Sequence, residues 1–278
     1  MSDPREVLSR QSPPPDATVR YGPDPDHAAD VRLAAGSAAA PLIVFMHGGF
    51  WRMEYDRTHV GPLADALAAA GYHVAVPEFR RVGQAGGGWP GTLDDVAAAV
   101  DAVPGLVADV AGPGRVDRDR VVLVGHSAGG HLALWAAGRH RLPSDSRWHR
   151  DTPPRVHGVV ALAAISVLAQ AVELGDGAAH DLLGGGPSEV PERYRQADPA
   201  QLPPTGIPVT LLHGADDEHV PVALSRAYAS TAWGAGDIAE LRELPGCEHF
   251  GLIDPMSSAW PAVLDAMASR SSQPANAH

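Results

Sequence analysis

Short apolar runs alternate with alanine- and leucine-rich stretches along most of this chain. The runs are rich in valine, leucine and isoleucine, as expected for strands that are buried on both faces of a parallel sheet. The stretches between them have the composition of helices, and strand alternating with helix predicts a doubly wound α/β fold with a mostly parallel central sheet. The expected strands are 41–47, 73–79, 120–126, 156–165, 208–214 and 238–244, and the expected helices are 61–71, 92–103, 129–140 and one near 257–269.

The length of the chain indicates one domain. It has 278 residues, of which 45% are hydrophobic, and this is enough for a single large core. We expect that domain over residues 18–269, with a flexible segment at 1–17 and a flexible tail at 270–278, because both ends lack apolar periodicity. Residues 166–206 are rich in glycine and proline and longer than an ordinary loop. They predict an irregular cap or lid insertion, with a solvated surface excursion as the alternative.

Composition excludes several partners and cofactors. The formal net charge of -12 leaves no basic face for nucleic acid or for an anionic membrane surface. The chain has no lysine, which excludes a P-loop lysine and a Schiff-base lysine for pyridoxal phosphate. The single cysteine, Cys247, makes no internal disulfide and indicates a reducing compartment. Residues 1–17 lack the apolar run of a signal peptide, and no stretch reaches membrane-spanning length, so we expect a cytoplasmic protein.

The motif GHSAG lies at 125–129, between an expected strand and an expected helix. A G-x-S-x-G string in that context predicts a nucleophile elbow, a sharp turn with Ser127 at its apex. Gly125 and Gly129 flank the serine, whose strained backbone and closely packed helix leave no room for side chains on these neighbours. Ser127 is therefore the expected nucleophile of a serine hydrolase.

A serine hydroxyl is a poor nucleophile near neutral pH, so it needs a histidine base that a carboxylate orients. In a sheet of this kind the acid follows a late strand and the histidine follows the last one. His249 comes shortly after the last expected strand and is the predicted base. Directly after the strand before it, Asp216, Asp217 and Glu218 compete for the role of the acid.

The segments HGGFW, GHSAGG, HGADDEHVP and CEHF together resemble the HGGxW branch of the α/β-hydrolase superfamily, which includes carboxylesterases and kynurenine formamidases (arylformamidases). The resemblance implies an α/β-hydrolase fold. It favours Asp217 as the acid, because the aspartate of an HG-x-x-D-x-x-V-P turn falls there, and leaves Asp216 as the alternative. It also implies an oxyanion hole in which the N–H groups of Gly48 and Gly49 face that of Ala128.

The same resemblance implies a serine hydrolase that forms an acyl-enzyme on a carboxylic ester of a small substrate, aromatic ones included, and it implies no metal or organic cofactor. An arylformamidase that hydrolyses N-formylkynurenine is the alternative, and a non-catalytic binding protein of this fold is a lesser one. Phe50, Trp51 and Trp89 are the expected substrate contacts. The arginines considered for a substrate carboxylate are Arg80, Arg81, Arg193 and Arg195.

Two further patterns suggest other functions. A metal site is conceivable where two histidines and three carboxylates crowd at 213–219, but no HExxH helix accompanies them. A G-x-G-x-x-G string at 86–91 resembles a dinucleotide-binding loop, but Pro90 removes an N–H group that should face a pyrophosphate. We expect neither a metal nor a nucleotide.

Overall fold

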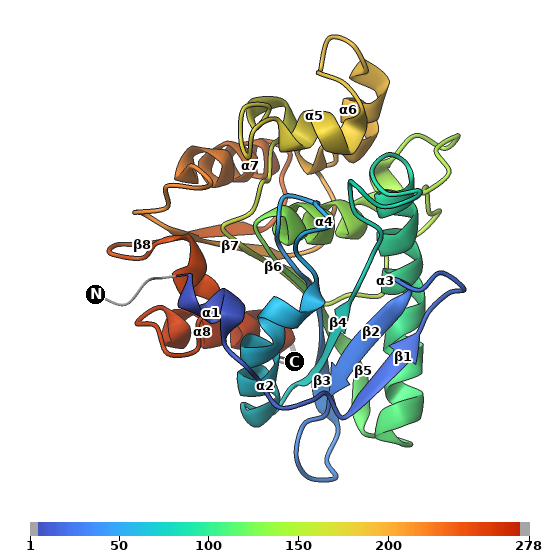
Figure 1. Cartoon of the computed structure of the whole chain (residues 1–278), viewed down its shortest axis with the longest axis vertical. Helices are drawn as coiled ribbons and strands as arrows, with labels where there is room; N and C mark the ends of the chain where they lie inside the picture. Colours follow the sequence, from blue (N-terminus) through green and yellow to red (C-terminus); the bar gives the residue numbers. More distant parts are fainter. Residues whose placement is uncertain (1–4, 273–278) are drawn as a thin grey trace.

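The computed structural model describes residues 5–272, which form one eight-stranded sheet with helices on both faces (Figure 1). The strand order is β1-β2-β4-β3-β5-β6-β7-β8. β2 runs antiparallel to its neighbours β1 and β4, and all other neighbouring strands are parallel. The expected α/β architecture is confirmed. The strands are β1 (Ala17–Arg20), β2 (Ala28–Arg32), β3 (Ala40–Met46), β4 (His73–Pro77), β5 (Val116–His126), β6 (Gly158–Leu162), β7 (Val209–Gly214) and β8 (Ala239–Leu244).

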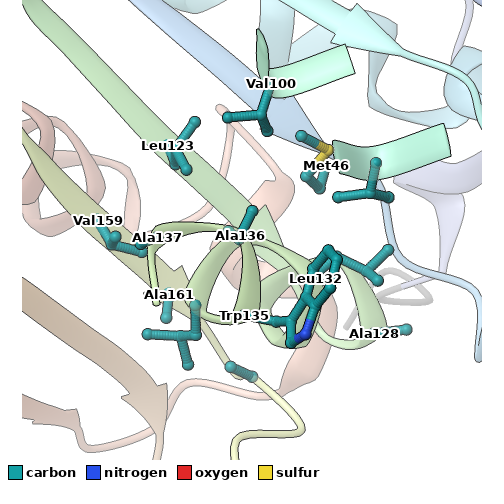
Figure 2. Close-up of a cluster of buried hydrophobic side chains, with 14 of the residues drawn as sticks. Met46, Val100, Leu123, Ala128, Leu132, Trp135, Ala136, Ala137, Val159 and Ala161 are labelled. Atoms are coloured by element: carbon teal, nitrogen blue, oxygen red, sulfur yellow. The ribbon is translucent and has the colours of Figure 1, made fainter. Parts of the chain in front are cut away.

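Two hydrophobic clusters cover the two faces of the sheet. In β3, Leu42 and Val44 point into the first cluster, whereas Ile43 and Phe45 point into the second. This two-sided burial explains why the strands are continuous apolar runs. Figure 2 shows the first cluster around Trp135, on the helix that follows β5. The helices on the first face are α3 (Gly91–Ala111), α4 (Ala128–Ala137) and α7 (Val222–Gly234), and those on the second are α2 (Gly61–Ala69) and α8 (Trp260–Ser271).

Helix α3 is longer than the expected helix 92–103. It continues to Ala111 with Pro104 inside it. Val103, Val107 and Ala111 are buried at helical spacing, so their burial stabilises the helix beyond Pro104, although proline disfavours the interior of a helix.

The expectation of an irregular insertion at 166–206 is wrong in part, because the segment contains two short helices, α5 (Ala178–Leu183) and α6 (Pro191–Ala197). Gly177 and Gly184 bracket α5 in the left-handed region, with φ of +80° and +71°. Proline at the first position of α6 fits a helix start. Some of the glycines and prolines that suggested irregular chain, such as Gly184 and Pro191, therefore mark helix boundaries.

The expectation that residues 1–17 fray is wrong for the residues that the structure describes. Residues 5–15, which we call the strap, begin with the short helix α1 (Glu6–Ser9) and lie beside α2 and α8 (Figure 1). Val7 is only 1% exposed and joins the second cluster. One buried side chain and a few polar contacts fix a segment that has no periodicity. Residues 1–4 lie outside the described part.

The chain beyond residue 269 was also expected to fray. Helix α8 includes Arg270 and Ser271, so that expectation is wrong for these two residues, while 273–278 lie outside the described part. Within residues 5–272, no helix combines the length and the apolar character needed to cross a membrane.

Candidate active site

Ser127 lies at the turn between β5 and α4, with φ of +57° and ψ of -120°. This conformation is strained for a residue with a side chain. A Cβ on Gly129 would lie 2.0 Å from the Met46 carbonyl oxygen, and one on Gly125 would lie 2.1 Å from the Gly129 carbonyl oxygen. The Ser127 N–H donates to the Leu162 carbonyl oxygen at 2.9 Å. The turn therefore has the geometry expected of a nucleophile elbow.

His249 begins the 3-10 helix η5 (His249–Ile253), which follows β8. Its Nδ1 lies 2.7 Å from Oδ2 of Asp217. The other carboxylate oxygen of Asp217 accepts the backbone N–H groups of His219 and Val220, each at 2.8 Å. Asp216 is exposed, so the structure brings Asp217 and not its neighbour onto the histidine.

The electrostatics of Asp217 favour its charged form. Burial alone raises the pKa of this carboxyl. Hydrogen bonds from His213 and His249 and the charge of His249 lower the pKa by more than burial raises it, so the net pKa lies well below its usual range. An ionised Asp217 accepts the Nδ1 hydrogen of His249, which leaves a lone pair on Nε2. Nε2 is then the nitrogen that can accept a proton from a nucleophile.

The loop after β3 approaches Ser127 closely. Gly48 and Gly49 line the same cavity as Ser127 and His249. A Cβ on Gly48 would lie 3.4 Å from the Cβ of Ser127. Ala128 begins α4, where backbone N–H groups have no partner within the helix. The three residues expected to form the oxyanion hole thus lie around the serine.

A buried pair that the sequence analysis missed supports this loop. Nδ1 of His47 lies 2.9 Å from the Gly48 carbonyl oxygen, and its Nε2 lies 2.8 Å from Oε1 of Glu78. Burial raises the pKa of Glu78, but His47, Arg57 and Arg81 together lower it to about 2. The ring thus bridges two acceptors, the carbonyl oxygen of the oxyanion loop and a buried carboxylate.

The orientation of the Gly48–Gly49 peptide follows from that contact. In a trans peptide the C=O and the following N–H point in opposite directions. The Gly48 carbonyl faces His47, so the Gly49 N–H points away from this histidine. His47 is the first residue of the HGG segment. Its place in that motif is the sequence feature that could have indicated its role.

The cavity has a volume of about 430 Å³. Phe50, Tyr55 and Phe250 give it aromatic surface. Carboxylates come from Glu173, Asp176 and Glu218, and an arginine comes from Arg5 in the strap. A site of this size and lining suits a small organic molecule.

Three further histidines, which the sequence analysis did not single out as cavity residues, line the same cavity: His59, His126 and His219. Burial is the first cause that lowers the pKa of each ring, to about 4 for His59 and well below its usual value for His126. Nε2 of His126 donates to the His249 carbonyl oxygen at 3.0 Å. His126 therefore fixes the backbone of the residue that carries the expected base.

Of the three expected substrate contacts, only Phe50 lines the cavity. Trp51 is 2% exposed, and its indole N–H donates to Nδ1 of His131 at 3.2 Å, inside the first cluster. Trp89 packs edge-on against Trp148, 4.8 Å between ring centroids, away from the cavity. The expectation for Trp51 and Trp89 is wrong because both rings are used in packing.

The four arginines considered for a substrate carboxylate do not line the cavity. Each has a partner within the protein: Asp95 for Arg80, Glu78 for Arg81, the Leu183 carbonyl oxygen for Arg193 and Glu192 for Arg195. These partners, and not a substrate carboxylate, hold the four arginines.

Residues 213–219 do not form a metal site. No group of three or more potential ligands comes together within residues 5–272. His213 instead donates from Nε2 to the Val220 carbonyl oxygen at 2.8 Å and lies 3.4 Å from Oδ2 of Asp217. It helps to hold the loop that carries the expected acid.

Comparison with known proteins identifies the family. Residues 30–231 match the family model described as BD-FAE. The chain belongs to the BD-FAE family. Among curated proteins, this BD-FAE chain is similar to Esterase LipQ of Mycobacterium tuberculosis, with 26% identity over 223 residues that cover 78% of the chain and 51% of LipQ. It is also similar to Esterase LipC of the same organism, with 27% identity over 264 residues that cover 85% of the chain and 60% of LipC.

The BD-FAE chain thus spans little more than half the length of these curated relatives. Among solved structures it resembles a truncated carbohydrate esterase from gut microbiota, with a TM-score of 0.76, 20% identity and coverage of 93% of this chain and 97% of the other. It also resembles a propionate-bound esterase from Thermogutta terrifontis, with a TM-score of 0.68, 20% identity and coverage of 91% of each chain. These likenesses show an α/β-hydrolase fold. The kynurenine formamidase branch stays a prediction.

Proposed function

We propose that this BD-FAE protein is a serine hydrolase that cleaves carboxylic esters of small substrates through a Ser127–His249–Asp217 triad. One observation carries the proposal: His249 lies 2.7 Å from the buried Asp217 carboxylate, in the same cavity as a serine in the strained elbow conformation. The esterases among its relatives support ester hydrolysis as the reaction.

In this mechanism His249 takes the proton of Ser127 as Oγ attacks the ester carbonyl carbon. The N–H groups of Gly49 and Ala128, with Gly48 beside them, stabilise the negative charge that develops on the carbonyl oxygen. The intermediate then collapses and breaks the bond to the alcohol, which leaves with the proton from His249. A water molecule attacks the acyl-serine, with His249 as the base again, and releases the acid and the free serine.

The cavity favours a neutral ester over an anionic substrate. The described lining residues include three with carboxylate side chains and one arginine, Arg5, so acidic groups outnumber the arginine. The arginines considered for a carboxylate group such as that of N-formylkynurenine do not line the cavity. Phe50, Tyr55 and Phe250 still fit an aryl group, so the formamidase reaction is the second candidate.

The test of the proposal is turnover by the wild type and by Ser127→Ala, on p-nitrophenyl esters of rising acyl length and on N-formylkynurenine. We expect ester hydrolysis by the wild type, a loss of about 10⁴-fold or more in the variant, and an unchanged melting temperature. A fluorophosphonate probe should label Ser127 in the wild type only. Retained activity in Ser127→Ala would contradict the triad, and preference for the formamide would establish the second candidate.

We also propose that the described chain is one domain and that the protein works in the cytoplasm. A single sheet with one hydrophobic cluster on each face supports the first statement. The lone, buried Cys247 supports a reducing compartment. Fractionation of the source cells with an antibody against the protein tests the location.

A further inference from the structure

The strap forms part of the wall of the catalytic cavity. Arg5 and Leu8 both line it, together with the proposed triad members Ser127 and His249. Leu8 is half-buried and packs against the second cluster, so its side chain lies between the core and the cavity. A segment before the first strand therefore contributes apolar surface to the place where substrate binds.

Contacts along its whole length hold the strap in one position. Both guanidinium nitrogens of Arg10 donate to the carboxylate of Asp254, at 2.5 Å and 3.1 Å. Val7 is buried in the second cluster. Farther along, Arg32 of β2 donates to the Ser12 hydroxyl at 3.1 Å and to the Pro13 carbonyl oxygen at 2.6 Å. Leu8 thus belongs to a fixed wall.

The strap lies on the side of the cavity where His249 is found. Its anchor, Asp254, directly follows η5, the five-residue helix that begins with His249. The rings of His219 and Phe250 lie 5.2 Å and 5.1 Å from the His249 ring. His219 and Phe250 line the cavity together with Arg5 and Leu8 of the strap.

Residues 173–176 also line the cavity. A Cβ on Gly175 would lie 2.6 Å from the ring of Phe50, so this segment packs directly onto the loop of the oxyanion hole. The proposed reaction distinguishes the part of the cavity near His249 from the rest, because His249 must reach the oxygen of the departing alcohol to protonate it. The alcohol part of an ester therefore lies toward His249, and the acyl part lies away from it.

We propose that the strap forms the part of the cavity wall that the alcohol group of the ester contacts. In this proposal the Leu8 side chain limits the size of that alcohol. The inference rests on the proposed esterase function and adds a residue that determines specificity. Leu8 acts through shape, since a pocket discriminates between substrates by the methylene groups that it accommodates or excludes.

The test uses the full chain and two series of unactivated esters, with acid release followed by pH-stat. The first series keeps the acyl group and varies the alcohol: ethyl, butyl and hexyl acetate. The second keeps the alcohol and varies the acyl group: ethyl acetate, butyrate and hexanoate. For Leu8→Trp we expect the kcat/KM ratio of hexyl acetate to ethyl acetate to fall about tenfold, and for Leu8→Ala we expect it to rise. The acyl series should change less than about twofold in both variants.

Val7→Ala is the matched control, because Val7 is the neighbouring residue but points into the core. It should lower the melting temperature and leave both series of ratios unchanged. Since Leu8→Ala and Leu8→Trp are expected to shift the alcohol ratio in opposite directions, loss of stability alone does not reproduce the pattern.

Three outcomes contradict the proposal. A shift confined to the acyl series would put the strap on the other side of the cavity, and unchanged ratios in both Leu8 variants would show that the strap does not touch substrate. Either result leaves the esterase function standing, because the wild type still turns over esters. A wild type that hydrolyses no ester and whose Ser127 is not labelled by a fluorophosphonate would overturn the function and the strap proposal together.

Discussion

At the scale of single residues, two adjacent aspartates have opposite environments. Oδ2 of Asp217 contacts His249, and Oδ1 accepts two backbone N–H groups, so both oxygens have partners. Asp216 is exposed, and its backbone N–H donates to the Cys247 carbonyl oxygen at 3.0 Å. One step along the chain thus separates a buried, ionised carboxylate from a solvated one.

This difference predicts the effects of two matched substitutions. Asp217→Asn should lower kcat by about 10⁴-fold, because an amide cannot hold the His249 tautomer that leaves Nε2 free to accept a proton. Asp216→Asn should change kcat less than about twofold. Steady-state kinetics on one p-nitrophenyl ester measures both. A large loss in Asp216→Asn beside a mild one in Asp217→Asn would reverse the assignment.

At the scale of elements, the approach of α4 to β3 depends on the absence of side chains at the elbow. The position of a Cβ on Gly129 overlaps the carbonyl oxygens of Met46 and His47, at 2.0 Å and 2.5 Å, and backbone atoms in a sheet cannot move aside. Gly234, at the end of α7, has nothing within 4 Å of the same position.

Alanine should therefore have opposite effects at these two glycines. Gly129→Ala should lower the free energy of unfolding by about 3 kcal/mol or leave the protein insoluble. Gly234→Ala should raise it by roughly 0.5 kcal/mol, because alanine loses less backbone entropy in a helix. Urea unfolding of both variants beside the wild type gives the two values. A Gly129→Ala protein as stable as the wild type would contradict the tight packing at the elbow.

The elements that the sequence predicted correctly are those whose own composition determines them. The six apolar runs became β3–β8, because strands buried on both faces need such runs. The elbow was predicted from the GHSAG motif between a strand and a helix, and the position of His249 was predicted from its place after the last strand. The strap and the helices α5 and α6 were missed, since they depend on contacts with distant residues, such as that of Arg10 with Asp254. For the same reason Trp51 was misassigned, because His131, its partner, lies 80 residues away along the chain.

At the scale of the whole molecule, buried neutral histidines link stability to pH. Burial lowers the pKa of His59 and of His131 to about 4, and that of His126 well below its usual value. Each has an ordinary value of 6.5, so the unfolded chain binds more protons than the folded one below that pH. Their contribution to stability is complete above pH 6.5 and is lost as the pH falls toward 4.

Stability should therefore decrease steeply between pH 6.5 and pH 4. Each such histidine adds about 1.4 kcal/mol per pH unit to the slope across that window. His131→Gln should flatten the slope by about one proton, because glutamine does not titrate. Urea midpoints at half-unit pH steps measure the slope. The same slope in His131→Gln as in the wild type would mean that this ring does not gain a proton on unfolding in that range.

The position of the strap also has a practical consequence for producing the enzyme. Arg5, the first residue that the structure describes, already belongs to the wall of the cavity. Trimming the chain back to β1 would therefore remove part of that wall, together with the ion pair of Arg10 with Asp254. Substrate profiles recorded on a protein trimmed before β1 would therefore describe a different cavity from that of the full chain.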